Sequence, residues 1–371
     1  MKVSSAIAEI LSREGVDVIF GYPRNPILES AASAGIRTVI VRQERTGVHM
    51  ADALSRLTRG QRMGVFAMQH GPGTENAYGG VAQAYAESVP VLVLPQGYAR
   101  RIAHVRDNYN ATQSMRDITK LAEPLTCPGE TSNIFRRAFS ALRNGRLRPV
   151  VVEIPWDVFD EDVGQVNYRP VVQTRSAPDP EAVARVAKTL TSARRPVIHA
   201  GQGIHWANAY DESRALAELL AAPVSTSLEG KSGFDETHHL SIGSGGAAIP
   251  GQLRHFLDQS DVILAIGCSL SETSFGVRMP VDKVLIHSTL DPSDINKSIA
   301  CADALVGDAK LTLKMLHDCC TEILRDARNP EPIANEIRQV EADWLAQWLP
   351  LLTSDEAPLS PYRVLWELQR T

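Results

Sequence analysis

The sequence predicts an α/β protein with two doubly wound parallel-sheet domains, because short apolar runs alternate with helical periods in two successive parts of the chain. The runs at 91–94 and 262–266 are entirely apolar, as expected for strands that are covered on both faces. Between these two parts lies a polar stretch with Pro170, Pro178 and Pro180, which is typical of a linker. The predicted organisation is a first domain, a linker, a second domain and a closing segment, at residues 1–166, 167–180, 181–328 and 329–371.

In the first domain, apolar runs predict strands, and apolar residues at helical spacing predict helices. Gly15 and Gly35 follow the first two helical patterns at the position where glycine commonly ends a helix. The segment 97–112 is polar, without a period, and its arginines suit a solvated face or a subunit contact. The expected elements are helix 3–14, strand 16–20, helix 26–34, strand 37–41, a helix from 44, strand 63–68, a helix ending near 88, strand 91–94, helix 131–144 and strand 150–154.

The second domain continues the alternation of helices and strands. The same reasoning predicts helix 180–192, strand 196–200, helix 207–221, strand 223–226, helix 249–258, strand 262–266, strand 284–287 and helix 308–325. An amphipathic helix that ends near 348 follows.

Composition excludes several classes of protein. A net charge of -5 and a pI near 6.1 give no basic footprint, so we expect neither a nucleic-acid partner nor a membrane partner. No apolar run approaches the roughly 20 residues of a membrane span. The five cysteines are odd in number and lack Cys-x-x-Cys spacing, which indicates reduced thiols and a cytoplasmic protein. The histidines lack metal-ligand spacing, so we expect no metal ligands in the chain.

Glu44 stands where a strand gives way to a helix. The apolar run 38–41 predicts a short buried strand, and apolar Val48, Ala51 and Leu54 then recur at helical spacing. In an open α/β sheet, ligands bind at the carboxyl ends of the strands. Glu44 is therefore a candidate site residue, and the alternative is an ordinary first-turn acid that the helix dipole stabilises.

Several motifs occur together in a fixed order: Val18-Ile-Phe-Gly-Tyr-Pro23, the Glu44 segment, Val65-Phe-Ala-Met-Gln-His-Gly-Pro-Gly-Thr-Glu-Asn76 and an apolar stretch at 91–95. This series resembles the pyrimidine-binding domain of thiamine-diphosphate-dependent enzymes of the acetolactate-synthase-like family. Leu290-Asp-Pro292 and Val306-Gly-Asp308 resemble late motifs of that family's central domain. The resemblance covers essentially the whole chain.

The resemblance implies that Glu44 contacts the N1′ atom of the aminopyrimidine of thiamine diphosphate and activates this cofactor. It places Gly71, Pro72 and Gly73 in a turn where the backbone approaches the cofactor, although an ordinary strand-to-helix turn is the alternative. His70 replaces the serine that is usual before this turn, and is either a polar group near the pyrimidine or a packing residue. Asn76, one turn into the helix, is either cofactor-facing or structural.

Two further loops match the family in part. Gln113 resembles a glutamine that reaches the active centre, which makes it a second candidate catalytic residue; the alternative is a polar loop residue. Gly21 and Pro23 match the first cofactor-side loop. Arg24-Asn25 replaces a Gly-Gly that is common in acetolactate synthases, so their substrate is not carried over.

The family resemblance implies a lyase or transferase that acts on carbon–carbon bonds next to a carbonyl. The reaction would be 2-oxo acid decarboxylation, acyloin or acetolactate-type synthesis, or 2-hydroxyacyl cleavage. The alternative is a non-catalytic regulatory or assembly partner with the same fold. The family also implies a homodimer or tetramer, in which helices with small residues such as Gly79 and Gly80 pair.

The closing segment 329–371 resembles the linker and start of the family's third domain, which binds diphosphate and magnesium. The Gly-Asp-Gly signature of that domain does not occur in the sequence. We therefore expect the ligands for diphosphate and Mg to come from a missing domain or from a second subunit, and the chain to be inactive without them. The chain would then be a subunit of a split enzyme or a truncated product.

The turn Gly201-Gln-Gly203 resembles part of a dinucleotide fingerprint, but Trp206 stands where the third glycine belongs. In the family this domain sometimes binds FAD, which we do not expect here because the flavin-holding segment is replaced. An ADP or CoA group in the central domain and a purely structural domain are the two remaining alternatives.

Overall fold

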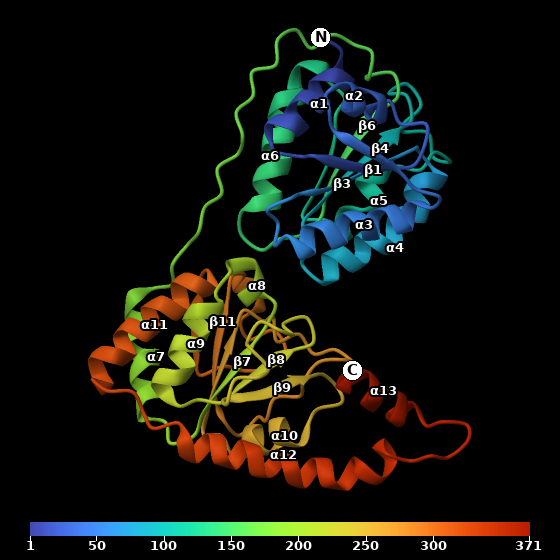
Figure 1. The fold of residues 1–371 in the computed structure, drawn as a ribbon. Helices are drawn as coiled ribbons and strands as arrows, with labels where there is room; N and C mark the ends of the chain where they lie inside the picture. Colours follow the sequence, from blue (N-terminus) through green and yellow to red (C-terminus); the bar gives the residue numbers. More distant parts are fainter. The chain divides into compact units, whose positions relative to one another are not determined.

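The computed structural model describes residues 1–371, which form two compact units, Met1–Arg175 and Ser176–Thr371. Each unit is built on one six-stranded sheet with helices on both faces (Figure 1). Neighbouring strands are parallel throughout both sheets. The prediction of two doubly wound parallel-sheet domains is confirmed.

The first sheet has the strand order β2-β1-β3-β4-β6-β5. The chain starts in β1, adds β2 on one side and then builds the rest of the sheet on the other side. The point where this direction reverses lies between β1 and β3, and loops at such a switch point leave a crevice at the carboxyl ends of the strands. The strands are β1 (Val18–Gly21), β2 (Arg37–Ile40), β3 (Gly64–Met68), β4 (Val91–Gly97), β5 (Leu121–Pro124) and β6 (Val150–Pro155).

Two groups of helices cover this sheet (Figure 1). One face is covered by α1 (Val3–Arg13), α2 (Ile27–Ser33) and α6 (Thr131–Arg143), and the other by α3 (Glu44–Leu57) and α4 (Pro72–Ala86). The core under α1 and α6 includes the fully buried rings of Phe135 and Phe139. The short helices are α5 (Ala111–Ser114), η1 (Arg116–Ile118) and η2 (Pro128–Glu130).

The second sheet has the order β12-β11-β10-β7-β8-β9, with its switch point between β7 and β10. Its strands are β7 (Pro196–Ala200), β8 (Val224–Ser227), β9 (Ser241–Gly245), β10 (Val262–Ile266), β11 (Val284–Thr289) and β12 (Asp303–Val306). One face packs against α7 (Pro180–Ser192), α9 (Tyr210–Leu220) and α11 (Ala309–Leu324), and the other against α10 (Gly251–Gln259) and α12 (Glu331–Leu352). The remaining elements are α8 (Gly203–Ala207), η3 (Pro292–Asp294) and α13 (Pro361–Arg370).

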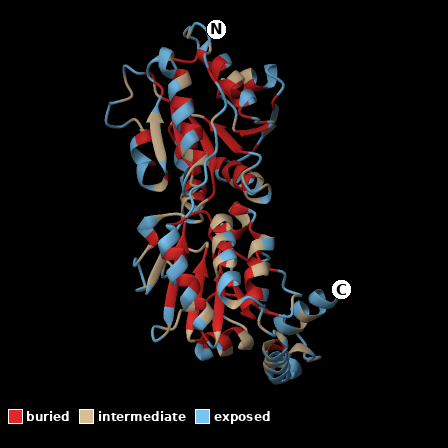
Figure 2. Cartoon of the chain, turned by 90° about the vertical axis from the view of Figure 1, so that its left-hand side faces the viewer, coloured by how far each residue is buried: buried red, intermediate tan, exposed pale blue.

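Buried residues concentrate in the sheets and on the inner faces of the helices, whereas α13 has no buried residue (Figure 2). The strand predicted at 91–94 is fully buried, as expected for a strand covered on both faces. None of the helices combines the length and the apolar character that a membrane span needs.

The structure corrects the sequence prediction at the sheet edges. The strand before Glu44 is not buried: β2 is an edge strand, and Ile40 is 57% exposed. Three further strands, β5, β9 and β12, were not predicted at all, and each lies at a sheet edge. The helix predicted over 207–221 is α9, and a short helix that was not predicted, α8, precedes it; Asn208 adopts a left-handed conformation between the two.

Candidate functional site

Glu44 opens α3 at the carboxyl end of the first sheet. Gln43, with an extended backbone, precedes the helix, and Glu44 is the acidic residue of its first turn, where the helix dipole favours negative charge. The residue is nevertheless only 4% exposed. Gly47 lies one turn later, and a Cβ there would come within 2.2 Å of the Phe66 ring. The missing side chain thus lets α3 lie directly on β3, which buries the carboxyl.

The loop between β3 and α4 approaches this carboxyl. Gly71 has φ +58°, a conformation that favours glycine, and Pro72 begins α4. A Cβ on Gly73 would stand 3.3 Å from the Oε1 atom of Glu44, so the loop passes beside the carboxylate. Asn76, one turn into α4, donates from Nδ2 to Oε2 of Glu44 over 3.3 Å. The structure therefore brings Glu44, Gly73 and Asn76 together.

His70 lies in the same loop but has different partners. Its Nδ1 is 3.2 Å from Oε1 of Gln96, and its ring lies edge-on to Tyr98 at 4.7 Å between centroids. The Trp156 ring is 6.1 Å away. A Cβ on Gly71 would come within 2.9 Å of the Tyr98 hydroxyl, so this cluster lies against the glycine turn. Gln96 lies in β4, whereas Tyr98 and Trp156 follow β4 and β6, and none of these partners was predicted from the sequence.

The first loop is held by a residue that the sequence analysis treated only as a departure from the family. Asn25 is 3% exposed, and its Nδ2 donates to the carbonyls of Met68 and Leu94, each over 2.9 Å. Its Oδ1 accepts from the Ile27 amide at 3.1 Å and so starts α2. Asn25 therefore ties this loop to the end of β3 and to the middle of β4.

Gly21 and Pro23, the predicted residues of this loop, differ from each other in their surroundings. A Cβ on Gly21 would come within 2.3 Å of Leu28 Cδ2, so this glycine allows close packing of β1 against α2. Pro23 is exposed. Neither residue forms a hydrogen bond with the Glu44 carboxyl.

Gln113 is exposed, and its backbone amide is capped by Oδ1 of Asn110 at 2.7 Å. No hydrogen bond joins its side chain to Glu44. The buried neighbour Thr112 donates from Oγ1 to Oε2 of Glu153 over 2.7 Å, and the Thr112 amide donates to the same atom over 2.9 Å. Glu153 thus fixes α5 at the carboxyl end of β6, with Gln113 on its outer side.

In the second unit, the amides of the glycine turn at 201–203 already form backbone hydrogen bonds within the chain. The amides of Gly201 and Gly203 donate to the carbonyls of Ile266 and Gly267, over 2.8 and 2.7 Å. A Cβ on Gly203 would come within 2.6 Å of the Gly267 Cα. These glycines let the turns after β7 and β10 pack together at the switch point, and their two amides are not free to bind a phosphate.

The arrangement around Glu44 can bind a planar polar ring. A buried carboxylate can accept or share a proton with a ring nitrogen, while a glycine-rich turn permits close approach of the ring to the backbone. No group of three or more His, Cys, Asp or Glu side chains lies together in a way that could hold a metal ion.

Two family models match the chain. The N-terminal TPP binding domain of thiamine pyrophosphate enzymes matches residues 1–121, and their central domain matches residues 183–316. Glu44 and the loop 69–76 lie within the first match.

Comparison with curated proteins gives relatives along nearly the whole chain. A "Probable acetolactate synthase large subunit" of Methanocaldococcus jannaschii is 30% identical over 99% of the chain. A "Probable 2-ketoarginine decarboxylase AruI" of Pseudomonas aeruginosa is also 30% identical, over 97% of the chain. The chain spans 63% and 65% of the lengths of these two relatives. Among solved structures, benzoylformate decarboxylase from Polynucleobacter necessarius has the same fold, with a TM-score of 0.77 and 23% identity over 89% of this chain and 62% of its own.

Proposed function

Because the chain belongs to the family of thiamine pyrophosphate enzymes, we propose that it supplies the pyrimidine-binding half of a thiamine diphosphate site. The enzyme would cleave or form carbon–carbon bonds next to a carbonyl, by 2-oxo acid decarboxylation, acetolactate-type synthesis or 2-hydroxyacyl cleavage. The buried carboxyl of Glu44 at the start of α3 carries this proposal. The names of the two relatives, a synthase and a decarboxylase, fall within the same reaction class.

The surroundings of Glu44 fit an aminopyrimidine. Asn76 is the one side chain that donates to this carboxylate, over a long 3.3 Å, whereas two carboxylate oxygens offer about four acceptor positions. Acceptor capacity therefore remains for a donor on a ring nitrogen. Gly71 and Gly73 remove the side chains that would otherwise obstruct a ring lying along the loop.

When bound, thiamine diphosphate supplies the electron sink for the carbon–carbon chemistry. Glu44 would hold a proton at the N1′ ring nitrogen and thereby favour the reactive tautomer of the pyrimidine. Asn76 would orient the Glu44 carboxyl through its hydrogen bond. Because α3 and the glycine loop bury this carboxyl, water competes little for it.

We also propose that the diphosphate and its magnesium ion are held by protein outside these 371 residues. A hard divalent cation needs several oxygen ligands, and no three His, Cys, Asp or Glu side chains of the chain lie close enough together to supply them. The ligands would belong to a further segment of the polypeptide or to a partner subunit.

The test is Glu44→Gln in the holoenzyme, assembled from the chain, thiamine diphosphate, magnesium and a diphosphate-binding protein. We expect a loss of turnover of 2-oxo acids, measured by carbon dioxide release, of roughly a hundredfold, or about 3 kcal/mol. Folding, followed by circular dichroism, should be unchanged.

Glu75→Gln is the matched control. Glu75 is likewise an acidic residue in the first turn of a helix, but it is exposed. We expect its substitution to change turnover by less than about threefold, because it removes only a dipole contact. Equal effects of the two substitutions would show that Glu44 is an ordinary helix-start acid.

A further inference from the structure

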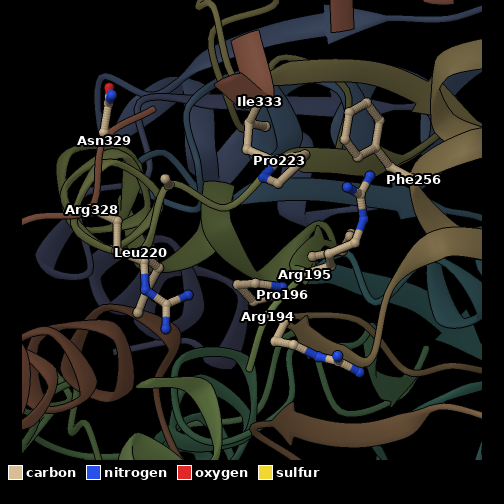
Figure 3. Close-up of a pocket in the computed structure, with 11 residues that line it drawn as sticks. Arg194, Arg195, Pro196, Leu220, Pro223, Phe256, Arg328, Asn329 and Ile333 are labelled. Atoms are coloured by element: carbon tan, nitrogen blue, oxygen red, sulfur yellow. The ribbon is translucent and has the colours of Figure 1, made fainter. Parts of the chain in front are cut away.

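Glu153 is a buried carboxylate that pairs with no cation. It lies near the carboxyl end of β6 and is 7% exposed. Glu336, by comparison, forms an ion pair with Arg195, which stands in the wall of a small pocket of the second unit (Figure 3). The hydrogen bonds of Glu153 all come from α5. A buried charge is costly unless hydrogen bonds compensate it, so the Glu153 carboxylate and α5 hold each other in place.

Three hydrogen bonds fix the start of α5. The Ala111 amide donates to Oε1 of Glu153 over 3.3 Å, and the Thr112 amide and hydroxyl donate to Oε2 over 2.9 and 2.7 Å. Gly97 in β4 provides the space for this carboxylate, since a Cβ there would come within 3.1 Å of Oε1. Gln113 is the next residue of α5, so its position follows from that of Thr112.

The residues on both sides of α5 lie against α4. Tyr109 interacts electrostatically with Glu75 in the first turn of α4, and η1 contacts the same helix. Asn76, which donates to Glu44, also belongs to α4. Because the strands are parallel, Glu44 after β2 and Glu153 in β6 lie at the same edge of the sheet. The α5 segment therefore borders the candidate site.

We infer that Glu153 is a positioning residue for Gln113. Its carboxylate holds α5, and thereby Gln113, at the border of the site, and Glu153 itself takes part in no chemical step. This inference rests on the function proposed for Glu44, with Gln113 as the second candidate catalytic residue of the same site. Loss of the Glu153 charge should release α5, and its effect on turnover should come through Gln113 alone.

Hydrogen exchange in the full chain measures whether Glu153 holds α5. In Glu153→Gln, peptides that cover 109–116 should exchange roughly tenfold faster or more, because charge-assisted hydrogen bonds are lost. Thr112→Val removes only the hydroxyl bond and should act in the same direction, whereas Thr112→Ser keeps this bond and should exchange like the parent. Unchanged exchange in Glu153→Gln would overturn the inference, because α5 would then be held without the carboxylate.

A double-mutant cycle in the holoenzyme tests whether Glu153 acts through Gln113. With pyruvate as the probe, Glu153→Gln and Gln113→Ala should each lower kcat/KM by roughly tenfold or more, because a displaced or missing catalytic group costs rate steeply. The double variant should lose no more than the greater single loss. Losses that multiply would show that Glu153 acts through another group, and an unchanged kcat/KM in either single variant would show that α5 has no part in turnover; each result overturns the inference.

Glu44→Gln separates the inference from the proposed function. A loss of turnover in Glu44→Gln without a loss in Glu153→Gln would leave the proposed function intact and overturn the role of Glu153. Unchanged turnover in all of these variants would refute the proposed function itself, and this inference with it.

Glu14→Gln is the matched control. Glu14 is likewise a buried carboxylate that accepts an amide and a hydroxyl from a distant segment, those of Val171 and Tyr168. It lies between α1 and β1, at the opposite, amino end of the sheet. Its substitution should speed exchange in 168–174 and leave kcat/KM unchanged. An equal loss of kcat/KM in Glu14→Gln and Glu153→Gln would indicate a general loss of stability and would overturn the positioning role.

Discussion

Replacing Asn25 by alanine should strongly destabilise the first unit, although the two residues before Asn25 in its loop are exposed. The side chain makes three hydrogen bonds, to the Met68 and Leu94 carbonyls and from the Ile27 amide. At about 1 kcal/mol each they contribute about 3 kcal/mol, and the buried groups left without partners bring the expected loss to about 3–4 kcal/mol. Asn25→Asp should cost at least as much, since it keeps the bond to Ile27 but directs an oxygen at two carbonyls.

Hydrogen exchange measured by mass spectrometry is the suitable assay, because a two-unit chain need not unfold in one step. Peptides from β3 and β4 report the free energy of opening of the first unit directly. Asn133→Ala is the matched control: Asn133 also forms two side-chain hydrogen bonds, but on the exposed start of α6. Asn133→Ala should lower the free energy of opening by no more than about 0.5 kcal/mol. A loss below about 1 kcal/mol for Asn25→Ala would refute the inference that the Asn25 hydrogen bonds hold its loop on β3 and β4.

Two further predictions concern stability. Burial lowers the pKa of His199 from 6.5 to about 4, so between these pH values the unfolded chain binds a proton at His199 that the folded chain does not. The free energy of unfolding of the second unit should therefore fall by about 3 kcal/mol as pH falls through this range. Urea unfolding at each pH should show this loss in the parent chain and not in His199→Gln. A Cβ on Gly64 would come within 2.0 Å of the Ala51 carbonyl oxygen, so Gly64→Ala should lower the melting temperature of the first unit and cost at least about 2 kcal/mol. Gly129→Ala is the control, because nothing lies within 4 Å of the added carbon, and it should leave the melting temperature unchanged. Equal melting temperatures for the two variants would contradict the packing argument.

The interior of both sheets could be predicted from the sequence, whereas the edges could not. Strands β4 and β10 are buried along their whole length, and each contains an unbroken apolar run, at 91–94 and 262–266. The missed strands β5, β9 and β12 are half-exposed, and their residues, such as Leu121-Ala-Glu-Pro124, show neither a run nor a clear alternation. The misreading of β2 as buried has the same origin, because an apolar run does not reveal that one side of the strand lacks a neighbour.

The candidate site shows the same division. The position of Glu44 at a strand-to-helix junction follows from local periodicity, and the resemblance to the family places Asn76 one turn into the next helix. The partners of His70 do not, because Gln96 is 26 residues away along the chain and Trp156 follows a different strand. Only the order of strands in the sheet brings these side chains together, and no short pattern in the sequence specifies that order.

The contact of α3 with β3 has a consequence for the thermodynamics of ligand binding. Gly47 meets the Phe66 ring and Gly64 meets the Ala51 backbone, so the helix is docked on the strand at two points along its length. The backbone that carries Glu44 is therefore held in place before a ligand binds, and the hydrogen bond from Asn76 orients the carboxyl. Little conformational entropy remains to be lost when a ligand reaches it, and the affinity of the carboxyl for its ligand should depend on the fit of these two glycine contacts.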